Sequence, residues 1–219
     1  MKLGILTTTG LLIAIGFASG VKAENVSQVK QLLETKKCTK CDLTGAQLAG
    51  TDLSGADLSG ANLRGANLNG ANLNEAKLNE ANLKKAKLQG ASLIGAKLHG
   101  ANLEGADLSR ANLSLAGLVI ASLKNTNLTS ANLIGANLES ADLAGANLRN
   151  ARQSVANLAD ISLRGGSVSG IDVQGVNLRD ANLTNANLTN ANLNGSDLTG
   201  ANLKNANMAN VDLKNASLP

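Results

Sequence analysis

The chain of 219 residues is almost free of aromatic side chains, and it contains very little proline or histidine. It has no Trp and no Tyr, one Phe, one Pro and one His. The lack of aromatic side chains argues against stacking on sugars or single-stranded nucleic acid. With His99 as the sole histidine, and no cluster of acidic residues beside a nucleophile, no catalytic constellation is recognisable. We therefore predict a protein that is not an enzyme and that has no small-molecule substrate, cofactor or metal.

Glycine is abundant, but it does not form a nucleotide-binding motif. None of the 23 glycines lies in the G-x-x-x-x-G-K-[ST] pattern of a phosphate-binding loop. Many instead recur every five residues, as in the run from Gly45 to Gly70. Glycine at regular intervals is typical of corners where the chain turns.

The dominant feature of the sequence is a repeat of five residues. From Leu43 to Leu218, every fifth residue is Leu in thirty-two of thirty-six cases, without insertion or deletion. The exceptions are Gln153, Val168, Val173 and Met208. Ala stands two residues before this position in twenty-seven cases. A period of five fits neither a helix nor a flat strand, whose periods are about 3.6 and 2.0 residues. It fits an all-β solenoid in which Ala and Leu point inward and the fifth residue turns the corner.

These pentapeptides resemble the pentapeptide-repeat family, whose consensus is A-(D/N)-L-x-x. The segments 56–60 (ADLSG) and 181–185 (ANLTN) are nearly literal matches, and the resemblance covers residues 41–218. It implies a right-handed quadrilateral β-helix with four pentapeptides per coil, and therefore about nine coils. Because each coil would contact only its neighbours, stability should add up along the rod. The two ends should be weak points, since each exposes leucines and unpaired backbone groups.

The N-terminal residues 1–23 have the pattern of a signal peptide. Lys2 precedes a stretch of apolar or small residues from 3 to 17, and Ala23 ends an A-x-A-like cleavage site. An uncleaved membrane anchor is the alternative, although the stretch is short for a membrane span. Cleavage would remove two lysines and no acid, so the net charge would fall from 20 − 16 = +4 to 18 − 16 = +2. We predict an exported protein with no stable membrane span after cleavage.

Residues 24–40 join the signal peptide to the repeat domain, residues 41–219, and residues 24–37 lack the five-residue period. Four apolar residues follow helical spacing: Val26, Val29, Leu32 and Leu33. Asn25 and Gln28, three residues apart, form a candidate capping box. We predict a short amphipathic helix over residues 24–37 that caps the first coil. Binding of a partner by the same apolar stripe is the alternative.

Cys38 and Cys41 form a C-x-x-C pair between this helix and the first coil. In an oxidising compartment, such a pair favours a disulfide that fixes the cap, with two inert thiols as the alternative. A c-type haem motif requires His where Asp42 stands, and a zinc site requires two more ligands. A thioredoxin-like site requires an α/β fold. The segment also resembles the L-L-x-x-x-x-C-x-x-C-(D)-L segment of exported cyanobacterial pentapeptide-repeat proteins. This resemblance implies the periplasm or the thylakoid lumen.

Two groups of outward residues are candidate interaction surfaces. The first is the basic column, which recurs every twenty residues with Glu104 inside it: Arg64, Lys84, Lys124, Arg164 and Lys204. It would suit an anionic partner, or it is an ordinary solvated face in which Lys84, Glu104 and Lys124 form a ladder of ion pairs.

The second is the apolar patch, on adjacent sides of the solenoid: Ile94, Leu115, Val119, Ile120 and Ile134. An exposed apolar group often marks an interaction surface, but corner residues can also tuck inwards.

The repeat is irregular between residues 151 and 176. Gln153 occupies an inward Leu position, and larger residues take Ala positions at Ile161, Ile171 and Val176. Smaller residues take Leu positions at Val168 and Val173, which is typical of volume compensation. We predict a bend or bulge in these coils, with a ligand cleft as the alternative.

The leading functional hypothesis is a non-enzymatic scaffold or protein–protein interaction module whose protein partner the sequence does not identify. The alternative comes from family members that imitate DNA and modulate a topoisomerase such as gyrase. That role requires a strongly acidic surface and access to the cytoplasm, whereas this chain is nearly neutral and has an export signal. Ice or surface binding through polar rows is a third hypothesis, but the outward residues form no unbroken Thr rows.

Because Leu218 lies at an uncapped end, we also predict a homodimer in which two rods pair through the C-terminal coil.

Overall fold

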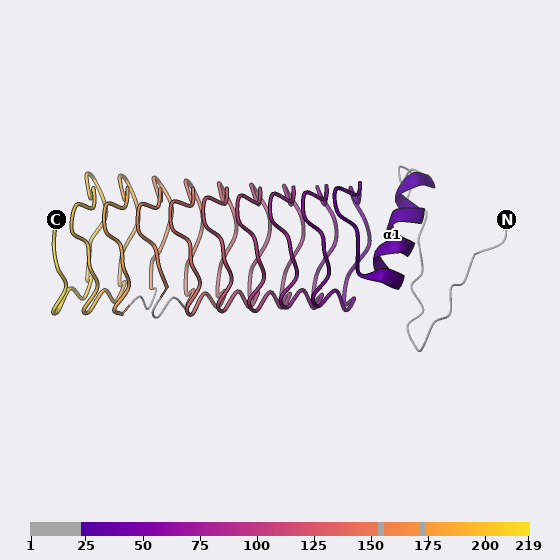
Figure 1. Ribbon diagram of the computed structural model, residues 1–219. Helices are drawn as coiled ribbons and strands as arrows, with labels where there is room; N and C mark the ends of the chain where they lie inside the picture. Colours follow the sequence, from indigo (N-terminus) through magenta and orange to yellow (C-terminus); the bar gives the residue numbers. More distant parts are fainter. Residues whose placement is uncertain (1–22, 153–155, 171–173) are drawn as a thin grey trace.

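The computed structural model describes residues 23–152, 156–170 and 174–219. The chain winds into a rod of stacked coils, with helix α1 (Ala23–Thr35) across one end and the C-terminus at the other (Figure 1). Apart from Ala23, the predicted signal peptide lies outside the described residues, and so do Gln153, Ile171 and Val173. Over the residues described, no helix is both long and apolar enough to span a membrane.

Successive coils are held together by parallel β-bridges between residues twenty positions apart. One outward row of bridges starts at Lys37↔Asp57 and ends at Asp197↔Ser217 without a change of register. Amides on both sides of a bridge take part, since Leu63 N donates to Asn82 O at 2.7 Å and Asn82 N donates to Ala61 O at 2.9 Å. The bridges are isolated, one in each pentapeptide, and are not part of longer strands in the described chain. The all-β prediction is therefore confirmed as a β-helical solenoid.

The core consists of Leu and Ala at the positions that the repeat predicts. From Leu43 to Leu148, every Leu of the period is at most 1% exposed. Three Ala positions hold hydroxyl residues instead, and each hydroxyl is hydrogen-bonded. Thr51 donates to Leu48 O at 2.7 Å, Thr126 donates to Leu103 O at 2.9 Å, and the Ser196 hydroxyl accepts from Val176 N at 3.3 Å. Each of the three hydroxyl groups that replace Ala in the core therefore has a hydrogen-bond partner.

Where Asn or Asp precedes the Leu of a pentapeptide, its side chain commonly closes the turn that follows. Asn102 Oδ1, for example, accepts from the backbone N–H of Glu104 at 3.0 Å. Asn side chains in neighbouring coils also bind one another, as where Asn82 Nδ2 donates to Asn62 Oδ1 at 3.2 Å. This use of Asx side chains gives a physical reason for the D/N position of the consensus.

The fifth residue of each pentapeptide turns the corner with a positive φ. Gly65 has φ +66° and Asn185 has φ +58°. Glycine adopts this left-handed region without steric cost, and Asn tolerates it better than most other residues. Among the described corners that are not glycine, Asn is the most frequent residue. Leu115 and Ile120 are the apolar residues in this set.

Helix α1 covers the end of the core, but not through the predicted capping box. The side chain of Leu32 is fully buried and Val29 is nearly so. Asn25 Nδ2 donates to Thr44 O at 2.7 Å, and Gln28 Oε1 accepts from Asp42 N at 2.6 Å. The capping-box prediction is wrong, because Asn25 lies inside the helix and both amide side chains bind the first coil.

A disulfide joins Cys38 and Cys41 where the helix meets the solenoid, with an S–S distance of 2.05 Å. Cys38 lies twenty residues before Leu58 in a Leu column, and Cys41 lies twenty residues before Ala61 in an Ala column. Both are buried. Since the first bridge is at Lys37, the coil geometry starts within the segment 24–40, before the first Leu of the period.

The irregular coils enclose a small apolar cavity. Ile161, Val168 and Val176 are buried, and glycine replaces Ala at position 166. A Cβ at Gly166 would lie 2.9 Å from Ala146 O and 3.0 Å from the Leu163 side chain, so the smaller residue gives Leu163 room. The cavity has a volume of about 20 Å³ and is lined by aliphatic side chains that include Leu143, Ile161 and Leu183. A cavity of this volume holds roughly one water-sized sphere, so it is too small to be a ligand cleft itself.

Candidate interaction surfaces

The apolar patch exposes its two corner residues to solvent. Leu115 is 68% exposed and Ile120 is 54% exposed, while Ile94 reaches 36%. Val119 and Ile134 are half-buried. The alternative that the corner residues tuck inwards therefore does not apply to Leu115 or Ile120.

The register of the coils gathers these residues from three consecutive turns of the solenoid. Ile94, Ser114 and Ile134 follow one another in one outward row, because the bridges Ser92↔Asn112 and Asn112↔Asn132 keep the coils aligned. Leu115 turns the next corner, where it leans over the following coil. A Cβ added to Gly135 would lie 2.8 Å from its side chain. The patch therefore wraps around an edge of the rod.

Gly117 separates Leu115 from Val119 and Ile120 and lowers the surface between them. The outward row that contains Gly117 has Lys97 before it and Asn137 after it. Gly117 has no side chain, and a Cβ there would meet nothing within 4 Å. The result is a shallow notch in the middle of the patch, which the sequence reasoning missed. A comparison of residues twenty positions apart would have found it, because the other described residues of this row have side chains.

The backbone at Ile120 is unfavourable for its residue type. Ile120 has φ +53° and Leu115 has φ +61°. The left-handed region costs L-residues roughly 1–2 kcal/mol, and a β-branched residue there is an outlier. Ile120 is thus both exposed to water and held in a strained conformation.

Replacement of Ile120 by Asn is expected to stabilise the fold. Asn is the most frequent non-glycine corner residue and tolerates a positive φ, so the variant should gain about 0.5–1 kcal/mol. Thermal and urea unfolding followed by circular dichroism would measure the gain. Asn185→Ile, the reverse change at another corner, is expected to cost a similar amount. A less stable I120N variant would contradict the strain argument.

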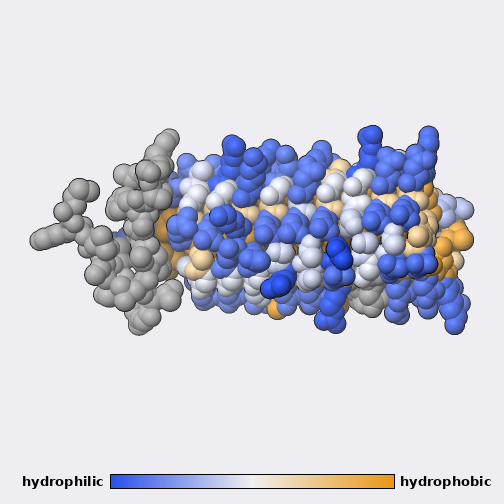
Figure 2. All heavy atoms as spheres, turned by 180° about the vertical axis from the view of Figure 1, so that it is seen from behind, coloured by the Kyte–Doolittle hydropathy of each residue, from blue (hydrophilic) through white to orange (hydrophobic). Residues whose placement is uncertain are grey.

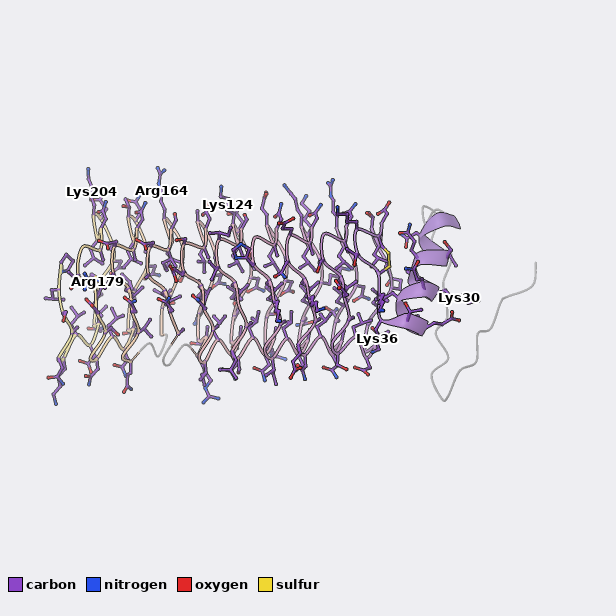
Figure 3. The ribbon with its side chains drawn as sticks, in the orientation of Figure 1. Lys30, Lys36, Lys124, Arg164, Arg179 and Lys204 are labelled. Carbon is purple, nitrogen blue, oxygen red and sulfur yellow. A yellow bond between two sulfur atoms is a disulfide. The ribbon has the colours of Figure 1, made fainter. Side chains whose placement is uncertain are left out.

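The basic column lies along one side of the rod, and its charge is partly neutralised. Lys124, Arg164 and Lys204 extend from the same side in Figure 3. Lys84 Nζ lies 2.8 Å from Glu104 Oε2, so the first step of the predicted ladder is confirmed. The second step is wrong, because Lys124 Nζ pairs with Asp142 Oδ2 at 3.0 Å. This pairing raises the pKa of Lys124.

The Lys84–Glu104 pair makes a small part of the stability dependent on pH. The hydrogen bond from Lys84 lowers the pKa of Glu104. A lowered carboxyl pKa stabilises the fold above the unfolded-state value of about 4.3, and this contribution is lost as the pH falls through the folded-state pKa. We expect the melting temperature of Glu104→Gln to fall less than that of the wild type between a pH of about 6 and about 3. If the melting temperatures of the variant and the wild type fall equally over this pH range, the pair does not have this role.

The C-terminal end of the rod exposes part of its core. Leu203, Met208 and Leu213 are half-buried, and Leu218 is 56% exposed. Figure 2 shows hydrophobic atoms gathered at this end, whereas the sides of the rod are mainly polar.

The described residues contain no group of three or more His, Cys, Asp and Glu side chains arranged to hold a metal ion. His99 is exposed on an outer row, one coil before Val119. It is not brought together with a nucleophile by the coil register, in which its neighbours along the row are Asn79 and Val119.

Comparison with known proteins gives the family. A family model described as Pentapeptide repeats matches in 8 copies, over residues 41–79, 76–114, 121–152, 156–195 and 181–218. A search of curated proteins gave no match.

Several solved structures are similar to the chain. HetL, a pentapeptide repeat protein involved in heterocyst differentiation regulation from the cyanobacterium Nostoc, is 32% identical, with 80% of this chain and 92% of HetL covered and a TM-score of 0.31. A pentapeptide repeat protein from the thylakoid lumen of Arabidopsis thaliana is 33% identical, with coverages of 53% and 71% and a TM-score of 0.29. QnrB1, a plasmid-mediated fluoroquinolone resistance protein, is 22% identical, with coverages of 84% and 91% and a TM-score of 0.46. The chain belongs to the pentapeptide-repeat family.

Proposed function

We propose that this protein is an exported, non-enzymatic scaffold that binds another protein through its apolar patch. The observation that carries the proposal is the pair of aliphatic corner residues, Leu115 and Ile120, which are exposed at positive φ. Exposure of an aliphatic side chain and a left-handed backbone both cost free energy. The exposed parts of these side chains add little to the core, and a partner that covers them would recover the cost of exposure.

The proposed location is the periplasm or the thylakoid lumen. It is supported by the signal-like pattern of residues 1–23 and by the Cys38–Cys41 disulfide, because disulfides persist in oxidising compartments. The similar Arabidopsis protein from the thylakoid lumen adds further support. On this basis we divide the chain into a signal peptide (1–23), a cap and junction (24–40) and a repeat domain (41–219).

We also propose the finer architecture that the family resemblance implies, a right-handed quadrilateral β-helix of about nine coils. Support comes from the twenty-residue spacing of the bridges and from the thirty-six pentapeptides of the period. The half-buried leucines of the last coil support pairing of two rods through their C-terminal ends.

The DNA-mimicking role is a weaker proposal for this chain. Mimicry of duplex DNA requires a strongly acidic surface, whereas the full chain has a net charge of +4. The basic column adds cations along one side, where Arg64, Arg164 and Lys204 are exposed. We propose this column as a secondary surface for an anionic partner.

The proposed function can be tested by affinity capture from a cyanobacterial host that expresses the full chain with a C-terminal tag. Mass spectrometry should place the mature N-terminus at Glu24, and Val119→Ser with Ile120→Ser should reduce partner capture at least tenfold. A matched control is Ala159→Ser with Asp160→Ser, which changes the same two structural positions two coils further on. Retention of Met1 would contradict export, and equal capture by the two double variants would contradict the role of the patch.

A further inference from the structure

Along the rod, the apolar patch is symmetric about the coil that contains Leu115 and Ile120, which we call the central coil. Ile94 lies one coil before Ser114 in its row, and Ile134 lies one coil after it. The central coil itself has two protruding apolar corners and the open position at Gly117. The apolar residues are therefore arranged alike in the two directions along the rod.

The charges beside the patch, in contrast, change sign from one side of the central coil to the other. Exposed Lys97 and His99 lie one coil before Gly117 and Val119, and exposed Glu139 lies one coil after Val119. Among the ion pairs of the described residues, none includes Lys97 or Glu139. The surface is thus basic on the α1 side of the central coil and acidic on the C-terminal side.

Symmetric apolar residues with antisymmetric charges favour pairing with a second copy in the antiparallel direction. In a two-fold interface, each residue that lies before the centre meets one that lies equally far after it. Ile94 would meet Ile134 of the second copy, and Glu139 would meet His99. Lys97 would meet Asn137 and lie diagonally across from Glu139, since Lys97 is two residues from His99. A parallel pair would instead place Lys97 against Lys97. Two coils from the centre, Lys77 and Glu80 would face Asp160, so the charges there select neither direction.

We propose that the occupant of the apolar patch is a second copy of this chain, bound side by side and antiparallel, with the two-fold axis at Gly117. This inference rests on the proposed function, since it uses the same patch. It differs from pairing through the C-terminal coil, because the contact lies along the side of the rod. The few side chains of the patch support a weak dimer, which forms in a concentration-dependent manner.

Gly117 has a defined role in this pair, because it lies where the two rods come closest. The same row holds Asn137 and Asn157, so an Asn side chain suits this outward position. A Cβ at Gly117 would meet nothing within 4 Å inside the chain. Gly117→Asn should therefore leave the fold unchanged and hold the two copies apart.

The test is sedimentation equilibrium of the purified, exported protein over a wide concentration range. The wild type should show a reversible monomer–dimer equilibrium, and Gly117→Asn should weaken it roughly tenfold or more. Asn177→Gly, three coils from Gly117 in the same row, is the matched control and should leave dimerisation unchanged. Thermal melts of both variants establish that the fold is intact.

Exchange of charges tests the antiparallel direction. Lys97→Glu and Glu139→Lys should each weaken the dimer, because like charges then meet twice across the two-fold axis. The double variant should restore it, because opposite charges face each other again. Double-variant rescue is not expected from an end-to-end or a parallel pair.

The outcomes separate this inference from the proposed function. A strict monomer at all concentrations overturns the self-pairing, as does a dimer that is insensitive to Gly117→Asn but lost on Leu213→Asp. If the protein is monomeric and Val119→Ser with Ile120→Ser still abolishes capture of other proteins, the proposed function stands without self-pairing. If neither dimerisation nor capture responds to the patch, both proposals fail.

Discussion

Leu98→Ala is expected to lower the free energy of unfolding by about 2–5 kcal/mol. The Leu98 side chain is fully buried, between Leu78 and Leu118 of its column. Each neighbouring coil is itself held by backbone hydrogen bonds, as where Leu98 N donates to Gly117 O at 2.7 Å. The coils therefore have little freedom to close the cavity that the truncation leaves. Urea unfolding followed by circular dichroism would measure the loss.

The same truncation at the end of the rod provides the control. Leu213 is only half-buried, because no coil of the described chain follows the one to which it belongs. Leu213→Ala should cost less than half as much as Leu98→Ala, since less apolar surface is lost from the core. Equal losses at the two positions would contradict the nearest-neighbour picture of solenoid stability.

Removal of the disulfide is expected to destabilise the cap by about 2 kcal/mol, the value that loop-closure entropy gives for a very short loop. The variant with Cys38→Ala and Cys41→Ala retains small apolar residues at both buried positions. Because coils interact mainly with their neighbours, the loss should be confined to α1 and the first coils. Hydrogen exchange followed by mass spectrometry should show faster exchange in α1 and unchanged protection around Leu183.

Reduction of the wild-type protein provides an independent comparison. Dithiothreitol should lower the stability of the cap in the wild type and have no effect on the double variant. If reduction instead unfolds the rod as a whole, the cap and the solenoid are one cooperative unit, and the local account is wrong.

The core of the rod could be predicted from the sequence because it depends on one period. A Leu every five residues with Ala two positions earlier determines which side chains point inward, and the bridges of the structure keep that register. The inward direction of these side chains depends on the direction of the Cα–Cβ bond alone. The same period places Leu115 and Ile120 at corners, where exposed and inward-tucked side chains are both compatible with the sequence.

Features that depend on a choice among partners could not be predicted in the same way. The ladder from Lys84 to Glu104 was expected to continue to Lys124, whose flexible side chain reaches Asp142 instead. Asn25 has the residue type and spacing of a helix cap, yet its side chain donates to the backbone of Thr44, nineteen residues further along the chain. Long side chains and amides have several partners within reach, and the sequence period does not distinguish among them.

The constant register of twenty residues per coil limits how such a chain can change its length. Insertion or deletion of one whole coil would lengthen or shorten the rod and leave every surface facing its original direction relative to α1. Gain or loss of a single pentapeptide would keep the core intact but rotate everything downstream by one side. The basic column before and after the change would then face different directions. Length in this protein therefore sets orientation as well as reach, and a partner that bridges two distant surfaces would detect a change of five residues more readily than one of twenty.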